Sequence, residues 1–178
     1  GGSDVRIALE GSSPALDNVR VWVQICGLVR GTPLVDLYLN GSWPRRALTR
    51  GYLLAAGASL DLLRELSHAR GALLASPARL PPGLLVINVV GFPLTSHLSG
   101  TTRARHRQLA ARGPNDGSTL LRDAIIKPGL VYPMWGADHY FRVPQASQLL
   151  YQLFLYLAQA GYLMPARKAS NHEHIQVV

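Results

Sequence analysis

Apolar residues gather in three runs along the chain that are suited to buried β-strands. They span residues 19–29, 84–94 and 127–136, the last centred on residues 130–135. The first two runs are apolar almost throughout and rich in β-branched residues, which is typical of a parallel strand covered on both faces. We therefore predict an α/β fold with one parallel sheet, in which residues 19–29 form an inner strand.

Apolar residues at helical spacing predict helices between and after these strands. Residues 5–10 continue a helix, residues 47–58 and 59–75 follow the first strand, and residues 145–163 follow the last. The segment from about residue 34 to 80 shows no strand pattern, which predicts a helical insertion between two strands. Ordinary packing of these helices on the core explains the same periodicity.

Composition and charge indicate a globular domain. The chain has 178 residues, 48% hydrophobic and 16% charged, which is enough to bury the core of one ordinary domain. The net charge of +8 attracts anionic partners, but the arginines are scattered, which favours a solvated surface over a nucleic-acid interface. No apolar run reaches the length of a transmembrane helix. The single cysteine, Cys26, excludes an intrachain disulfide, is compatible with a reducing compartment, and is interpreted as a small buried hydrophobe.

Two polar turns carry the candidate chemistry. Asp116 lies in an Asn-Asp-Gly turn beyond the second strand, and His139 lies in the turn after the third. Because parallel strands end at the same edge of a sheet, we expect the two side chains to meet there. An aspartate that accepts a hydrogen bond from one ring nitrogen of histidine leaves the other nitrogen available as a general base. These two turns provide no nucleophile.

At these residues the chain resembles the carboxy-terminal half of an α/β-hydrolase of the lipase and esterase type. In that superfamily the nucleophile comes first, the acid second and the histidine last. Residues 1–10 resemble the helix that follows a Gly-x-Ser-x-Gly elbow, with Gly1 as its last glycine. The resemblance implies Asp116 as triad acid, His139 as triad base, and a serine two residues ahead of Gly1. It also implies that the helical insertion is a lid, which would present Trp43 or Tyr52 to a hydrophobic substrate.

The resemblance further implies that residues 1–178 are a partial α/β-hydrolase domain with a loosely packed or disordered tail at about 165–178. Joined to the missing amino-terminal half of the fold, the domain would hydrolyse small-molecule or lipid esters, and it would be inactive alone. Acyl transfer by such a triad needs no metal and no organic cofactor. An acyltransferase with the same triad and a non-catalytic basic binding module are the alternatives.

Several other residues are alternative candidates for the catalytic or substrate-binding positions. Ser3 is an alternative nucleophile, disfavoured because Val5 stands where the elbow would close with glycine. Asp123 is an alternative acid, expected on a helix. Thr32 and Asp36 follow the first strand and could approach substrate, although helix capping is the favoured role for either.

Three histidine-containing features have weaker signals. His68 is interpreted as a surface or packed histidine. The basic segment 95–112, with four arginines and two histidines, is interpreted as an exposed connection rather than a phosphate site. His172 and His174 form a His-x-His pair that would need a third ligand nearby to bind a metal.

Overall fold

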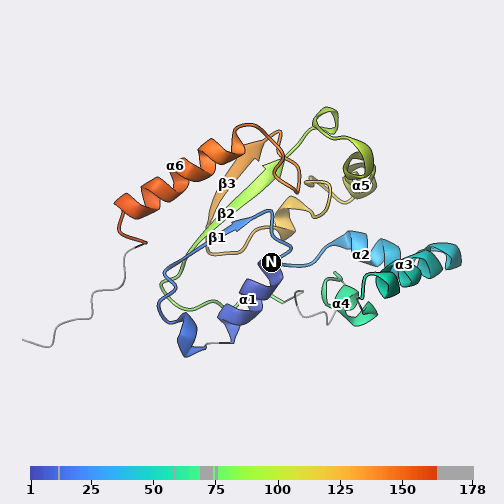
Figure 1. Ribbon diagram of the computed structural model, residues 1–178, viewed down its shortest axis with the longest axis horizontal. Helices are drawn as coiled ribbons and strands as arrows, with labels where there is room; N and C mark the ends of the chain where they lie inside the picture. Colours follow the sequence, from blue (N-terminus) through green and yellow to red (C-terminus); the bar gives the residue numbers. More distant parts are fainter. Residues whose placement is uncertain (12, 58, 69–73, 75, 164–178) are drawn as a thin grey trace, which may run out of the picture.

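Three parallel strands form the sheet of this protein (Figure 1). The computed structural model describes the chain apart from residues 12, 58, 69–73, 75 and 164–178. β1 (Val21–Ile25) and β3 (Leu130–Trp135) lie on either side of β2 (Leu85–Phe92), and Val23 stands opposite Ile87. The predicted parallel sheet and the α/β class are therefore confirmed.

The first strand differs from its prediction in length and in position. Within the described residues, β1 is an edge strand and β2 is the inner strand, so the inner position predicted for residues 19–29 is wrong. β1 ends at Ile25 because Cys26 has a φ of 47°, a left-handed conformation that cannot continue a strand. Residues 86–91 of β2 are buried, as expected for an inner strand.

Different helices cover the two faces of the sheet (Figure 1). α6 (Ala146–Gln159) lies on one face, where Leu157 is fully buried against β2. α1 (Gly2–Glu10) lies on the other face, where Leu9 belongs to the same apolar cluster as Val86. Neighbouring residues of β2 point to opposite faces, so one apolar strand supplies both clusters.

One arginine of α1 is fully buried and ties this helix to two loops. Arg6 Nη1 donates to the carbonyl oxygens of Val29 at 2.6 Å and Leu74 at 3.0 Å. Its Nη2 donates to the carbonyl oxygen of Ser76 at 2.8 Å, and its Nε donates to Glu10 Oε1 at 2.9 Å. The rigid guanidinium fork satisfies several acceptors at once, which allows a charge to be buried here.

Three helices form the insertion between β1 and β2: α2 (Pro33–Leu39), α3 (Trp43–Ala55) and α4 (Leu60–Glu65). The helical character predicted for this segment is confirmed, but the boundaries differ. α3 starts four residues before the predicted helix, because Pro44 suits the first turn of a helix. α4 covers only the beginning of the predicted residues 59–75, of which 69–73 and 75 lie outside the described part.

The basic segment 95–112 is largely helical rather than a simple exposed connection. It contains the 3₁₀ turn η3 (Thr95–His97) and the helix α5 (Gly100–Ala110). Leu109 is completely buried and packs in a cluster with Leu34 of α2. The helical signal is weak because most side chains of α5 are polar or basic and few are apolar.

Candidate functional site

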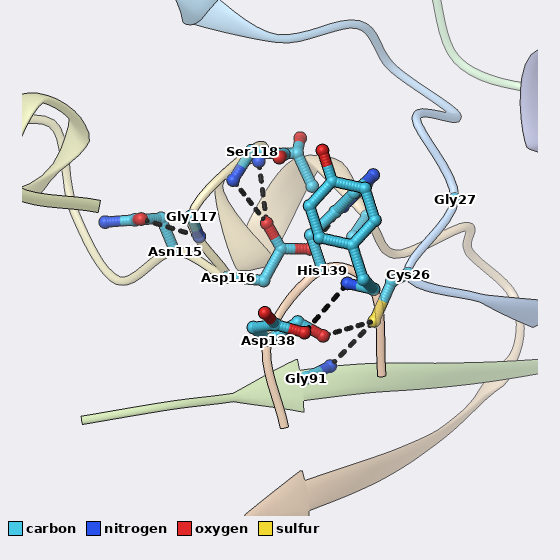
Figure 2. Close-up of polar contacts among 12 residues, drawn as sticks. Cys26, Gly27, Gly91, Asn115, Asp116, Gly117, Ser118, Asp138 and His139 are labelled. Carbon is cyan, nitrogen blue, oxygen red and sulfur yellow. Dashed lines mark hydrogen bonds and ion pairs between the residues drawn. The ribbon is translucent and has the colours of Figure 1, made fainter. Parts of the chain in front are cut away.

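Asp116 lies in a turn that fixes the orientation of its carboxylate (Figure 2). Its Oδ1 accepts hydrogen bonds from the backbone N–H groups of Ser118 and Thr119, both at 2.8 Å. Gly117 completes the turn with a φ of 92°, and a Cβ at this position would lie 2.6 Å from Thr102 Cγ2. The Asn-Asp-Gly sequence thus leaves the second oxygen, Oδ2, of a fully buried carboxylate available to another partner.

That partner is His139, which follows β3 (Figure 2). His139 Nδ1 is 2.9 Å from Asp116 Oδ2, and the His139 backbone N–H donates to the Asp116 carbonyl oxygen at 2.9 Å. Since a carboxylate only accepts hydrogen bonds, Nδ1 carries the proton and Nε2 of the neutral ring keeps a free lone pair. The imidazole side chain is 18% exposed, whereas the carboxylate side chain is 1% exposed. The meeting of these two side chains, expected from the sequence, is present in the structure.

Asp138 and Arg142 brace the loop that carries His139. The Asp138 carboxylate accepts hydrogen bonds from the backbone N–H of Tyr140 at 3.0 Å and from Arg142 Nε at 2.9 Å. Burial acts to raise the pKa of Asp138, but the hydrogen bonds and charge of Arg142 outweigh it and hold that pKa below its usual value. The Tyr140 ring meets the His139 ring edge-on at 5.4 Å between centroids, and Arg142 lies 5.0 Å from the centroid of the Tyr140 ring. The imidazole is therefore positioned by both neighbouring residues and the buried aspartate.

Cys26 lies beside the same loop, and its thiol is unreactive. Its Sγ accepts a hydrogen bond from the Gly91 N–H at 3.1 Å and lies 3.9 Å from the Asp138 carbonyl oxygen. Burial first, and then the charges of Asp116 and Asp138, raise the pKa of Cys26 to about 12. The thiol is therefore protonated at neutral pH and is a poor nucleophile. Its predicted burial is confirmed.

The first residues of α1 approach the same end of the sheet. A Cβ at Gly2 would lie 2.9 Å from the Cα atom of Gly27, the residue that follows Cys26. Such a close approach of two backbones places the amino end of α1 against the carboxyl end of β1 (Figure 1). Ser3, the alternative nucleophile, makes no hydrogen bond with His139 among the described residues.

A second pair of carboxylate and imidazole involves Asp123 and His68. Asp123 lies in the 3₁₀ turn η4 (Leu121–Asp123) and is buried, and its Oδ2 is 3.0 Å from His68 Nε2. Asp123 is therefore not on an α-helix, contrary to its prediction. It also makes no contact with the imidazole that pairs with Asp116. No local sequence signal joins these two residues, because the pair forms only when the insertion folds back on η4.

Thr32 and Asp36, the two candidate substrate contacts, make hydrogen bonds inside the protein. The Thr32 hydroxyl accepts from the Leu34 N–H at 3.2 Å, which caps α2 as predicted. The same hydroxyl donates to the carbonyl oxygen of Ser118 in the turn of Asp116. Asp36 lies inside α2 and caps no described helix, so its predicted capping role is wrong, and it accepts a hydrogen bond from the Ser67 hydroxyl. Thr32 thus connects the start of the insertion to the turn of Asp116, and Asp36 connects two parts of the insertion.

Metal ligands and membrane spans are not apparent in the described part of the chain. There, no group of three or more His, Cys, Asp or Glu side chains is arranged to hold a metal ion. The pair His172 and His174, with the tail predicted for residues 165–178, lies outside the described residues. Among the helices that are described, none combines the length and apolar character needed to cross a bilayer.

We compared the chain with protein-family models, with curated proteins and with solved structures, and none of them matches it.

Proposed function

We propose that this chain supplies the acid and the base of a serine hydrolase that acts on carboxylic esters or lipids. The observation that carries the proposal is the hydrogen bond between His139 Nδ1 and Asp116 Oδ2. It joins two turns beyond neighbouring parallel strands, at the edge where α/β folds bind ligands. The fold class we propose is the later half of an α/β-hydrolase, with residues 34–80 as its lid-like insertion.

In the proposed reaction, a serine hydroxyl attacks the ester carbonyl carbon while His139 Nε2 takes the hydroxyl proton. The proton then passes from Nε2 to the leaving alcohol, which departs as the acyl-serine forms. Water attacks the acyl-serine in the same way and releases the carboxylic acid. Asp116 keeps Nδ1 protonated throughout and stabilises the imidazolium that forms in each half of the reaction. No step calls for a metal or an organic cofactor.

We propose further that the serine precedes Gly1 in the full-length protein. The approach of Gly2 to Gly27 supports this assignment, because it brings the amino end of α1 to the sheet edge where His139 lies. Residues directly ahead of α1 would then turn sharply from a strand into this helix, as a nucleophile elbow does. Cys26 is unsuited to the role because its thiol stays protonated.

The full-length protein is expected to hydrolyse a simple activated ester such as p-nitrophenyl butyrate, with butyric acid as the product. Adding a primary alcohol distinguishes hydrolysis from acyl transfer to another acceptor. A hydrolase continues to give mainly the acid, whereas an acyltransferase gives mainly the new ester. Absence of any ester turnover by the folded full-length protein would contradict both forms of the proposal and favour a binding role.

A further inference from the structure

A strongly basic segment lies against the loop of His139 and has no part in the proposed triad. Residues 95–112 contain four arginines and two histidines but no aspartate or glutamate. Arg142 Nη2, from the loop of His139, donates to Thr102 Oγ1 of α5 at 3.1 Å. α5 also contacts α2, the first helix of the insertion. The positive charge of this segment is therefore placed between the insertion and the catalytic pair.

One arginine of α5, Arg105, reaches the loop of His139. It comes three residues after Thr102, which places both side chains on the same side of the helix. Its Nη1 donates to Tyr140 Oη at 3.5 Å. Burial acts to lower the pKa of Arg105, but hydrogen bonds with Tyr38 of α2 and with Tyr140 outweigh it and raise that pKa above its usual value. The guanidinium is therefore held between the insertion and the loop of the catalytic pair.

Tyr140 connects this arginine to the imidazole. Its hydroxyl accepts the hydrogen bond from Arg105, and its ring meets the His139 ring edge-on at 5.4 Å between centroids. An anion bound by Arg105 would therefore lie beside the proposed reaction centre, one tyrosine side chain away from the imidazole.

The charge of Arg105 is not balanced by an ion pair in the described part of the chain. There, the arginines that pair with a carboxylate are residues 6, 64, 122 and 142. The two carboxylates beside the imidazole already have partners, since Asp116 pairs with His139 and Asp138 pairs with Arg142. A guanidinium has five N–H donors in a planar fork that matches a carboxylate or a phosphate. Arg105 is half-buried, so part of this fork is open to solvent.

We infer that Arg105 binds an anionic group of the substrate, so that the preferred esters carry a carboxylate or a phosphate in addition to the ester bond. The inference rests on the proposed function, because it needs His139 as the base at the ester carbonyl. An anion held at a fixed place would position that carbonyl against the catalytic groups, which lowers the entropic cost of reaching the transition state. Arg105 would thus determine specificity and take no part in proton transfer.

The test compares two p-nitrophenyl esters as substrates of the full-length protein. The glutarate half-ester is the butyrate ester with a carboxylate added at the end of its acyl chain, so the pair differs in charge at one place. The half-ester should have the higher kcat/KM, and added salt should reduce this preference. Arg105→Gln should lower the ratio of the two kcat/KM values about 10- to 100-fold, the usual effect of losing a hydrogen bond to a charged group. Arg105→Lys keeps the charge without the fork and should give an intermediate ratio.

Two further comparisons identify the anion and its place in the substrate. 4-Acetoxybenzoate carries its carboxylate on the leaving group, and a preference for it over phenyl acetate that Arg105→Gln removes would also support the inference. Glutarate and methyl phosphate are then compared as inhibitors of butyrate hydrolysis. The one that inhibits more strongly, and loses that advantage in Arg105→Gln, shows whether the site favours a carboxylate or a phosphate.

Arg107→Gln is the matched control, because it removes the same charge from an exposed position of α5. It should change the ratio of the two kcat/KM values less than about twofold. The neutral ester reports any general damage to the site, since the ratio is taken within one variant. Hydrolysis of the neutral ester without any effect of Arg105→Gln on either anionic ester, or equal effects of Arg105→Gln and Arg107→Gln, would overturn this inference and leave the hydrolase proposal standing. Absence of turnover with every ester would instead refute the hydrolase proposal, and this inference with it.

Discussion

Replacing His139 by alanine in the full-length protein is expected to lower ester turnover by about 10⁶-fold, the cost of removing the base from a catalytic triad. The imidazole is the proposed acceptor of the serine proton, and no other histidine is hydrogen-bonded to Asp116 among the described residues. The loop should keep its shape, because the His139 backbone N–H to Asp116 carbonyl bond and the contacts of Asp138 remain. Initial rates with p-nitrophenyl butyrate, together with a thermal melt, measure both effects.

Asp116→Asn is the complementary change, with an expected loss of about 10⁴-fold. An asparagine keeps an oxygen for the N–H groups of Ser118 and Thr119, so the turn should survive. Its amide nitrogen would then donate to His139 Nδ1, which moves the ring proton to Nε2 and removes the base. Asp123→Asn is the matched control, because it alters the other buried carboxylate that pairs with a histidine. The assignment fails if Asp123→Asn costs as much as Asp116→Asn, or if His139→Ala retains full turnover.

Arg6→Ala is expected to lower the free energy of unfolding by about 3–5 kcal/mol, because each buried carbonyl oxygen left without its donor costs about 1–3 kcal/mol. The substitution would remove the donor for the buried carbonyl oxygens of Val29 and Leu74 and for that of Ser76. It would also leave Glu10 without its cation and open a cavity between α1 and the loops. Urea unfolding of the two proteins, monitored by circular dichroism, gives the difference.

Arg64→Ala provides the control for this prediction. Arg64 also pairs with a carboxylate on a helix, but its side chain is 67% exposed and that of Asp61 is 79% exposed. Water solvates both groups when the pair is broken, so the expected loss is below about 0.5 kcal/mol. Similar losses for Arg6→Ala and Arg64→Ala would show that the buried network contributes little to stability.

Local patterns in the sequence were sufficient for the sheet and for the meeting of Asp116 with His139. The apolar runs at residues 84–94 and 130–135 match the positions of β2 and β3 closely. β2 is buried as an inner parallel strand should be, but β3 is an edge strand of the described sheet in which only Met134 is buried, so its prediction as a buried strand is wrong. Once these strands are parallel, the turns that follow them emerge on the same side. The Asn-Asp-Gly turn could also be identified locally, because only glycine adopts the φ of 92° at Gly117 without strain.

Features that depend on contacts between distant segments escaped sequence analysis. Arg6 looks like any basic residue of a helix, and its burial depends on carbonyl groups from residues 29, 74 and 76. The pair of His68 with Asp123 likewise joins segments that are far apart in the chain. The high exposure of Trp43 and Tyr52 on α3 could not be derived either, because helical periodicity alone does not tell which side of a helix faces solvent. The catalytic roles of Asp116 and His139 stay predictions until activity is measured.

The most direct test of the proposed triad is covalent labelling of the full-length protein with a fluorophosphonate, which reacts with activated serines. Peptide mapping should find one labelled serine ahead of Gly1, within a Gly-x-Ser-x-Gly sequence, and His139→Ala should abolish the label. Asp123→Asn should be labelled as the unaltered protein is. Absence of label in the folded protein, label on Ser3, or full labelling of His139→Ala would contradict the proposal that Asp116 and His139 activate a serine upstream of this chain.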